Sequence, residues 1–232
     1  MKVRLISYSQ ADKDAFNEYD EHGTSNSLQE LIAFCARVSN PSNQFNTETS
    51  NKLIRYLIKH QHWSPLEMVS ACLEITTTRD IARQILRHRS FSFQEFSQRY
   101  ADPTNDLDFE TREARLQDQK NRQNSVDTDD RELKRLWQEK QQGVIRAARE
   151  AYTWAISNGI AKEQARAVLP EGNTVSKLYM NGTLRSWIHY IQLRSANGTQ
   201  KEHMEVARAC ATVIANVFPM ATEFVDEQGK KE

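Results

Sequence analysis

The chain has 232 residues, enough for one sizeable domain with a hydrophobic core. Lysine plus arginine and aspartate plus glutamate each number 31, so the formal net charge is zero, which argues against a general nucleic-acid binder. The cysteines Cys35, Cys72 and Cys210 have neither pair nor metal-ligand spacing, so we expect no disulfide framework and no metal site. The sequence shows no signal peptide and no apolar run of about 18 residues, and we expect a soluble protein of a reducing compartment with no membrane partner.

The pattern of apolar residues predicts strands and helices along most of the chain, and we expect an α+β fold with an antiparallel sheet flanked by helices. Alternation marks the strands, and apolar stripes at helical spacing mark the helices. The expected elements, in chain order, are a strand at 2–8, a turn-rich stretch at 9–26, helices at 28–38 and 47–60, a strand at 69–76, a helix at 80–87, a long helix at 133–158, a short helix at 161–169, a strand at 174–179, a helix at 183–195 and a last helix that contains residues 204–217.

Residues with hydroxyl groups mark the expected starts of three helices. Either Thr77 or Thr78 can cap the helix that follows the second strand, and Thr183 can cap a later one. Thr199 and Glu202 have the spacing of a capping box for the last helix.

Residues 101–135 are highly polar, with charges of both signs and only scattered apolar side chains. Such a composition cannot bury much surface. We therefore expect one domain, residues 1–232, with a polar insertion at about 101–135 that forms a mobile loop or a solvated helix.

The densest group of candidate functional residues lies at 87–100, which contains three arginines, a histidine, a carboxylate and three serines among aromatic residues. Guanidinium groups bind phosphate with two parallel hydrogen bonds, and serine hydroxyls fill remaining acceptor positions. The stretch therefore indicates a half-buried polar site for an anionic, aromatic-ringed ligand. Two alternatives are a basic helix end followed by an ordinary strand, and a single-stranded nucleic-acid module in which the aromatic rings stack on bases.

Helical spacing groups other candidate residues. Gln84, Arg87 and His88 are three and four residues apart, so they share a helix face. Arg185 and His189 share another face, whereas a residue nine positions beyond Arg185, such as Arg194, lies about half a turn away.

A loop at 61–68 offers one further candidate. Pro65 favours an extended conformation at Ser64, which would expose the Ser64 hydroxyl.

Three motifs resemble those of the flavin-dependent thymidylate synthases, over about residues 39–202 except the polar insertion. The family pattern R-H-R-x-x-S-x-N-E-x-S-x-R-Y is matched at Arg87, His88, Arg89, Ser92, Glu95, Ser97, Arg99 and Tyr100, with Gln94 in place of the usual Asn. The pattern H-x-[ST]-P-x-E-H is matched at His62, Ser64, Pro65 and Glu67, with Met68 in place of the second His. The pattern R-x-V-L-P is matched at 166–170.

The resemblance implies roles for the matched positions. It implies flavin contacts for Ser64, Arg87, His88, Arg89, Thr183, Leu184, Arg185 and His189, the last of which stands where many members have Asn. It implies substrate contacts for Gln84, Arg87, Glu95, Phe96, Ser97, Gln98, Arg99, Arg166 and Arg194. Arg194 matches the arginine that activates the substrate base in the family.

The same resemblance implies a reaction. A cytoplasmic homotetramer with shared active sites would convert dUMP to dTMP, with 5,10-methylenetetrahydrofolate as carbon donor and NADPH as reductant through FAD. An arginine held at the N3 and O4 edge of uracil stabilises the negative charge that enriches C5 in electron density. A flavoprotein reductase without nucleotide methylation is the third alternative, but it would not need Arg166 and Arg194.

Overall fold

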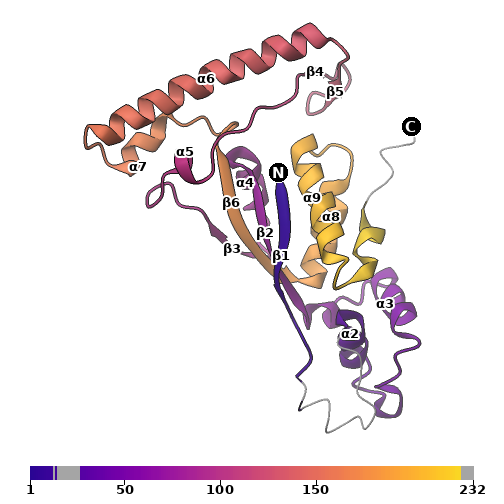
Figure 1. The fold of residues 1–232 in the computed structure, drawn as a ribbon. Coiled ribbons are helices and arrows are strands. Elements are labelled where there is room, and N and C mark those ends of the chain that lie inside the picture. Colours follow the sequence, from indigo (N-terminus) through magenta and orange to yellow (C-terminus); the bar gives the residue numbers. More distant parts are fainter. Residues whose placement is uncertain (13, 15–26, 226–232) are drawn as a thin grey trace.

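The computed structural model describes residues 1–12, 14 and 27–225. Its centre is an antiparallel four-stranded sheet with strand order β1-β2-β6-β3 (Figure 1). The strands are β1 (Lys2–Tyr8), β2 (Ser70–Thr78), β6 (Val175–Thr183) and β3 (Ser92–Glu95). Helices flank this sheet, which confirms the α+β fold expected from the sequence. Most of the turn-rich stretch at 9–26 lies outside the described residues.

The two central strands place two functional helices at opposite ends of the sheet. Strands β2 and β6 pair without a break from Ser70↔Thr183 to Thr78↔Val175. Strand β2 continues into α4 (Arg79–Ile85), and β6 continues into α8 (Leu184–Ser195). Because the strands are antiparallel, α4 begins where β6 begins, and α8 begins where β2 begins.

Two C-terminal helices cover one face of the sheet and complete the main core. Helix α8 packs against α9 (Lys201–Ile214), and α9 also contacts β1 and β2 (Figure 1). Trp187 of α8 is fully buried and donates from its indole Nε1 to the carbonyl oxygen of Ala71 at 3.0 Å. The expected apolar stripe of α9 is confirmed, since Val206, Cys210 and Ile214 are buried.

The N-terminal helices pack at one end of the molecule. They are α2 (Leu28–Ala36) and α3 (Ser50–Lys59), joined through a short 3-10 helix at Pro41–Asn43. The loop expected at 61–68 contains a second 3-10 helix, η2 (Ser64–Glu67), so the extended conformation expected for Ser64 is wrong. The first bond of this turn joins Leu66 N to Trp63 O at 3.0 Å, and Pro65 fits there because this helix position needs no N–H donor.

One of the three expected helix caps has the expected hydrogen bond. The Thr183 hydroxyl accepts from the backbone N–H of Ser186 at the start of α8, as expected. Thr78 occupies the cap position of α4, but its hydroxyl donates to the Asp80 carboxylate at 2.7 Å instead of accepting from the backbone.

The expected capping box at the start of α9 is wrong. Helix α9 begins one residue later, with Gln200 at the cap position and no side-chain cap. The Thr199 hydroxyl instead donates to the carbonyl oxygen of Leu193 at 3.4 Å. Glu202 forms an ion pair with Arg115, so neither residue of the pattern is available for capping.

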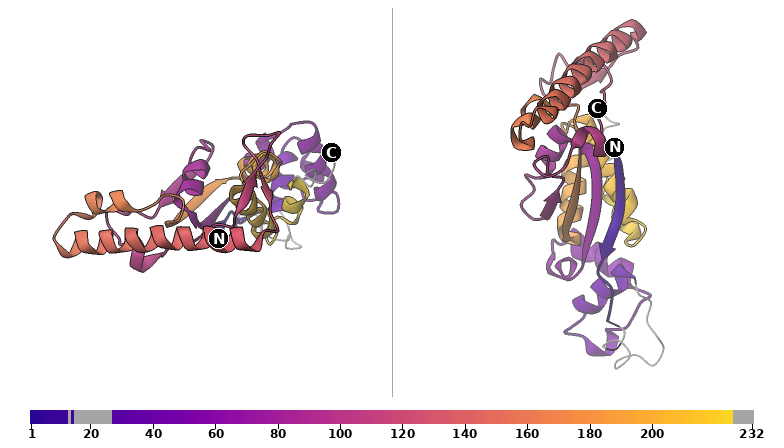
Figure 2. Two further views of the ribbon diagram at one scale, coloured as in Figure 1. Left: turned by 90° about the horizontal axis from the view of Figure 1, so that it is seen from above. Right: turned by 60° about the vertical axis from the view of Figure 1, so that its left-hand side comes forward.

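Residues 103–170, which we call the arm, lie beyond one end of the sheet. Figure 2 shows α6 crossing this end, with α2 and α3 at the opposite end. The arm contains α5 (Pro103–Asp106), the hairpin strands β4 (Arg115–Gln117) and β5 (Ser125–Asp127), α6 (Arg131–Ser157), α7 (Lys162–Ala165) and a 3-10 helix at Arg166–Val168. The polar insertion at 101–135 therefore contains a short helix, a hairpin and the exposed first turn of α6, joined by irregular segments, so it is more structured than the loop or single helix that we expected.

The apolar residues that predicted α6 divide into two groups. Ile145 and Tyr152 are buried, and Tyr152 packs in a small cluster with Ala155, Ala165 and Leu169. Leu136, Trp137 and Val144 are 40%, 44% and 52% exposed. Within residues 1–12, 14 and 27–225, nothing covers the apolar surface formed by these three side chains.

A close contact fixes the segment between α4 and β3. A Cβ atom added to Gly182 of β6 would lie 2.4 Å from Cδ1 of Phe91. The Phe91 ring also meets Trp187 edge to face, with ring centroids 4.8 Å apart. The stretch that carries the R-H-R motif is thus held against the sheet by one aromatic ring.

Candidate active site

The R-H-R motif contributes its histidine to a polar cluster between α4, α8 and α9. The members of this histidine cluster are Gln84, His88, Tyr190, Arg194 and His203. The Arg194 Nε donates to the His88 Nε2 at 2.9 Å. The His88 ring meets Tyr190 edge to face with centroids 4.9 Å apart, and His203 is fully buried beside them.

Both histidines of the cluster are neutral at neutral pH. Burial, followed by the charge of Arg194, lowers the pKa of His88 to about 4. Burial, followed by the charges of Arg194 and His88, lowers the pKa of His203 to about 3. Because a guanidinium can only donate, His88 must accept at Nε2 and carry its proton on Nδ1. Arg194 is therefore the permanent positive charge of the cluster.

Gln84 joins the cluster through both ends of its amide. Its Oε1 lies 3.1 Å from Nδ1 of His203, and its Nε2 donates to Oε1 of Gln200 at 2.8 Å. The other ring nitrogen of His203 lies 3.2 Å from the Tyr190 hydroxyl, whose pKa burial raises well above its usual value. Arg87 does not join them, because α4 ends at Ile85 instead of near 87 and Arg87 points to solvent.

Sequence reasoning missed Tyr190, His203 and Gln200. Two signals could have found the first two. Tyr190 lies four residues before Arg194 on the same helix, and therefore on the same face. His203 lies one turn before Val206 and Ala207 on the buried face of α9, where a polar side chain requires a hydrogen-bond partner.

The motif carboxylate Glu95 forms a second group on β3. Its Oε1 accepts from the Ser176 hydroxyl at 2.8 Å. Arg83 forms an ion pair with the other carboxylate oxygen, and Arg79 lies 3.9 Å away. The two arginines are four residues apart on α4, a spacing that sequence reasoning did not use. The negative charge of Glu95 is therefore balanced by the positive charges of Arg83 and Arg79.

The residues that follow β3 lead toward the arm. Phe96 continues the sheet pairing through its N–H, which donates to the carbonyl oxygen of Lys177 at 2.8 Å. The Ser97 hydroxyl accepts from the backbone N–H of Arg99 at 3.4 Å. Gln98 is buried, and within the described residues its Nε2 has no hydrogen-bond partner. A buried donor of this kind has capacity for a ligand acceptor.

Arg99 and Arg166, two arginines predicted to bind substrate, both contact Glu163 of the arm. Arg99 pairs with the Glu163 carboxylate at 3.4 Å, and the Arg166 Nε donates to the Glu163 carbonyl oxygen at 3.3 Å. Arg99 is exposed and Arg166 is half-buried. Residues 67 positions apart in the sequence therefore present their guanidinium groups from one small region.

The start of α8 and η2 form a third group. Arg185 forms an ion pair with Glu67, and the His189 ring meets Trp63 edge to face with centroids 4.5 Å apart. Burial, followed by the charge of Arg185, lowers the pKa of His189. Ser64 lies between Trp63 and Glu67 and is exposed, so it belongs to the same surface.

Leu184 cannot contact a ligand through its side chain. The side chain is fully buried in the main core, and its backbone N–H donates to Val69 O at 3.0 Å. Thr183 is half-buried and its hydroxyl is used by the cap. The backbone carbonyls of these two residues accept intrahelical bonds at the start of α8, so neither residue leaves an obvious free group for a ligand.

The arginines on either side of His88 are available for an anion. Arg87 and Arg89 are exposed, and neither guanidinium forms an ion pair within the described part of the chain. A diphosphate requires this kind of donor set, so these residues fit a dinucleotide cofactor.

Other classes of site receive no support from the described residues. They contain no group of three or more His, Cys, Asp or Glu arranged to hold a metal ion. The three cysteines are free, and burial raises the pKa of each thiol. No helix among the described residues is long and apolar enough to cross a membrane.

Comparisons with known proteins agree with the motifs. The family model described as thymidylate synthase complementing protein matches residues 23–220. A flavin-dependent thymidylate synthase of Synechocystis is 49% identical over 219 residues, which cover 94% of this chain and 96% of that protein. A probable flavin-dependent thymidylate synthase of Paramecium bursaria Chlorella virus 1 is 48% identical over 204 residues, 87% of this chain and 92% of that protein.

A solved structure has the same fold. The UMP/dUMP methylase PolB from Streptomyces cacaoi, bound with 5-Br dUMP, superimposes with a TM-score of 0.74 and 25% identity, and the match covers 96% of this chain and 93% of that one. The family model spans the histidine cluster, the Glu95 group and the arm. The chain therefore belongs to the flavin-dependent thymidylate synthase family.

Proposed function

We propose that the protein is a cytoplasmic enzyme that methylates dUMP reductively to dTMP, with 5,10-methylenetetrahydrofolate as carbon donor and NADPH as reductant through FAD. The observation that carries this proposal is the contact of the Arg194 guanidinium with a neutral His88, the histidine of the R-H-R motif. The names of the relatives and the nucleotide bound to PolB support it. The free cysteines fit a reducing compartment.

Residues at the protein surface would hold the flavin. Arg87 and Arg89 would bind its diphosphate, with His88 between them, and Ser64, Arg185 and His189 would contact it from the η2 surface. Thr183 and Leu184 would lie beside it at the start of α8. When bound, the flavin supplies the redox chemistry that amino-acid side chains cannot.

A second set of residues would hold the nucleotide. Gln84 would contact the pyrimidine, and the segment from Glu95 to Arg99, comprising Glu95, Phe96, Ser97, Gln98 and Arg99, would hold the sugar and phosphate together with Arg166. The unpartnered Nε2 of Gln98 and the convergence of Arg99 and Arg166 support this assignment. The arginine forks match the geometry of a phosphate.

Arg194 would act on the nucleobase. Its Nε is bound to His88, and its two terminal amino groups remain to donate to O4 of uracil, which has a second lone pair for another donor. Because both histidines are neutral, the positive charge is concentrated on one guanidinium in a half-buried site, where electrostatic stabilisation is strong. Negative charge that develops on the base would be stabilised there, which makes C5 a better nucleophile.

The enzyme would work as a homotetramer with shared active sites. The exposed apolar residues of α6 support an interface, since large apolar side chains gathered on one helix surface mark contact sites. Light scattering should show a tetramer for the natural chain and a smaller species for Trp137→Glu. A natural chain that is monomeric at high concentration would contradict this part of the proposal.

Optical spectroscopy tests the function as a whole. The purified protein should carry an oxidised flavin spectrum that bleaches with NADPH. It should regain the oxidised spectrum and form dTMP only when dUMP and methylenetetrahydrofolate are both added. Bleaching without dTMP formation would favour a reductase, and a protein without bound or bindable flavin would overturn the proposal.

A further inference from the structure

We infer that a relay of positioning residues fixes the direction in which the Gln84 amide faces the substrate base. Its members are His203, Gln200, Glu202 and Arg115. The inference rests on the proposed function, in which Gln84 contacts the pyrimidine. It adds residues outside the family motifs, and it gives them a role in the choice between pyrimidine bases.

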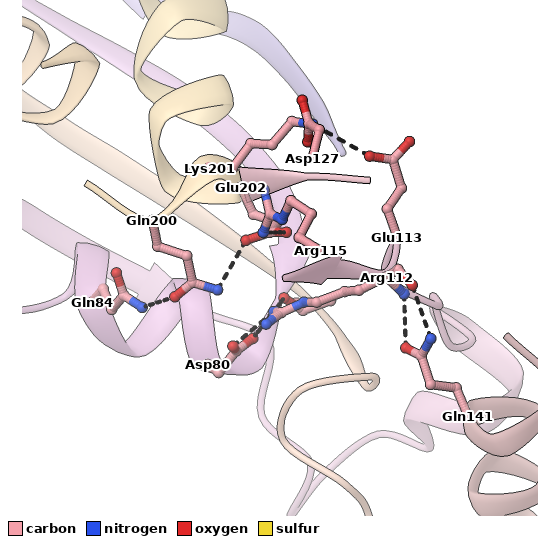
Figure 3. Close-up of polar contacts among 11 residues, drawn as sticks. Asp80, Gln84, Arg112, Glu113, Arg115, Asp127, Gln141, Gln200, Lys201 and Glu202 are labelled. Carbon is pink, nitrogen blue, oxygen red and sulfur yellow. Dashed lines mark hydrogen bonds and ion pairs between the residues drawn. The ribbon is translucent and has the colours of Figure 1, made fainter. Parts of the chain in front are cut away.

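The relay is continuous from the arm to the histidine cluster (Figure 3). Arg115 of β4 donates to Oε1 of Glu202 at 2.5 Å, and Gln200 donates from Nε2 to Oε2 of the same carboxylate at 2.9 Å. Gln84 donates to Gln200 at 2.8 Å and faces His203 at 3.1 Å. The Arg115 and Glu202 side chains are only 11% and 24% exposed, so water competes weakly for the charged end.

The carboxylate sets the direction of every hydrogen bond in the relay. An ionised carboxylate only accepts, so Gln200 must turn its amino group toward Glu202 and its oxygen toward Gln84. Gln84 must then present its own amino group to Gln200 and its oxygen to His203. His203 must carry its proton on Nδ1, and its Nε2 accepts from the Tyr190 hydroxyl. The tautomer of a buried histidine is thus determined by a charge three hydrogen bonds away.

Reversal of the Gln84 amide is blocked in this arrangement. A reversed Gln84 would set its oxygen against that of Gln200, and a reversed Gln200 would set its oxygen against the Glu202 carboxylate. Each case places two acceptors in contact in a half-buried site, which is costly. Gln84 therefore keeps one N–H and one oxygen lone pair for a ligand, in a fixed order.

A fixed amide discriminates between pyrimidines. Uracil has a donor at N3 and an acceptor at O4, whereas cytosine has an acceptor at N3 and a donor at N4, so the two positions are exchanged. An amide that could reverse would accommodate either base. The relay accordingly makes Glu202 a specificity-determining residue that favours dUMP over dCMP without touching either nucleotide.

The arm is part of this device. Arg112, three residues before Arg115, donates to both Asp80 oxygens at 2.6 and 2.7 Å and to the Thr78 hydroxyl at 2.8 Å, at the start of the helix that carries Gln84 (Figure 3). The segment from Arg112 to Arg115 therefore contacts α4 through Arg112 and α9 through Arg115. Residues three positions apart in the arm thus bind the helices that carry the two ends of the relay.

Glu202→Gln tests the relay in the FAD-loaded enzyme, with Glu205→Gln on the exposed face of the same helix as the matched control. In Glu202→Gln, Arg115 should donate to the oxygen of the new side-chain amide, so the amino group of that amide should face Gln200. Gln200, Gln84 and His203 should then reverse in turn. Nitrogen-15 NMR of the His203 ring should show the proton on Nδ1 in the natural enzyme and in Glu205→Gln, and on Nε2 in Glu202→Gln.

Kinetics provide the second readout. The ratio of kcat/KM for dUMP to that for dCMP should fall about tenfold in Glu202→Gln, the effect of one misdirected hydrogen bond, and should be unchanged in Glu205→Gln. Gln200→Leu, which breaks the relay without reversing it, should give both His203 tautomers and a similar loss of discrimination. Thermal unfolding of each variant checks that it is folded.

The outcomes separate this inference from the proposed function. A proton on Nε2 in the natural enzyme, or an Nδ1 proton that persists in Glu202→Gln, would overturn the relay even if dTMP is formed normally. A reversed tautomer with unchanged discrimination would overturn the specificity role. Absence of dTMP formation in the natural enzyme would reject the proposed function, while the NMR result would still decide the direction of the relay.

Discussion

The body of the molecule and the arm are held together by different interactions. The body is the sheet together with α2, α3, α4, α8 and α9. The main core lies outside the arm, with Trp187 and Tyr190 among its fully buried side chains. The arm buries a small cluster around Tyr152 and attaches to the body through ion pairs such as Arg112–Asp80 and Arg115–Glu202 and through backbone hydrogen bonds such as that from Val175 N to Asp108 O. Hydrophobic burial fixes the fold, whereas directional polar contacts fix the place of the arm relative to the site.

The largest expected effect contrasts two tryptophans. Trp187→Ala should lower the free energy of unfolding by about 3–5 kcal/mol, because it empties a filled core position. Trp154→Ala on α6, where the side chain is 62% exposed, should change it by less than about 0.5 kcal/mol. Urea denaturation at equal protein concentration measures both. Similar losses for the two variants would mean that the arm is as tightly packed as the body.

The second prediction compares the loss of a charge in the body, at Arg194, with the loss of a charge on the arm, at Arg135. Arg194→Ala should retain FAD and flavin reduction by NADPH, yet lower dTMP formation about a hundredfold or more, as expected for one lost electrostatic donor. Arg194→Lys should restore only part, since an ammonium lacks the planar fork. Arg135→Ala, which removes an exposed pair on α6, is the control. Loss of flavin from Arg194→Ala would reassign the residue to the cofactor.

Acid should weaken the body before it affects the arm. The folded-state pKa values of His88 and His203, about 4 and about 3, lie below the ordinary histidine value of 6.5. Between pH 6.5 and 4 the unfolded chain therefore binds more protons, and stability should fall as the pH falls, by up to about 1.4 kcal/mol per pH unit for each histidine. Residues 103–170 contain no histidine.

Urea midpoints at pH 7 and pH 5 measure this slope. His203→Asn keeps a donor toward Gln84 but cannot titrate, so its slope should be shallower than that of the natural chain. An identical slope would show that His203 is already protonated in the folded state or is not buried there.

The smallest effect concerns the attachment of the arm. Arg112→Ala removes the bond to Asp80 and should speed limited proteolysis within residues 101–135 about fivefold, because a half-buried ion pair contributes on the order of 1 kcal/mol. High salt should bring the natural chain closer to the variant. First cleavage within α6, with 101–135 intact, would contradict polar attachment as the weak point.

The sequence predicted the helices of the body and the strands β1, β2 and β6, but not β3, because the patterns of the predicted elements reflect local physics. The alternation of β2 and the stripes of α8 and α9 follow directly from burial on one face. The end of α4 could not be predicted, because it depends on how the chain returns to place Phe91 beside Gly182. The hairpin at 115–127 was missed, since its few apolar residues give no alternating face and ion pairs to the body hold it.

Those residues of the candidate site that belong to contiguous sequence motifs could be predicted. Spacing identified the R-H-R segment and separated Arg185 from Arg194, which contact Glu67 and His88 respectively. The hydrogen-bond partners of His203 and Gln200 could not be predicted, because they depend on tertiary contacts with α4 and the arm. The false capping box at Thr199 has the same cause, because the pairing of Glu202 with Arg115 prevails over the local hydrogen bond.

The contact between Gly182 and Phe91 has a consequence for how the family can diverge. A methyl group at position 182 would overlap the ring, whereas a smaller residue at position 91 would leave a gap beside Trp187. Neither position can change alone without loss of stability, but a larger residue at 182 combined with a smaller one at 91 conserves the volume. The two positions should therefore covary among homologues, although they are 91 residues apart.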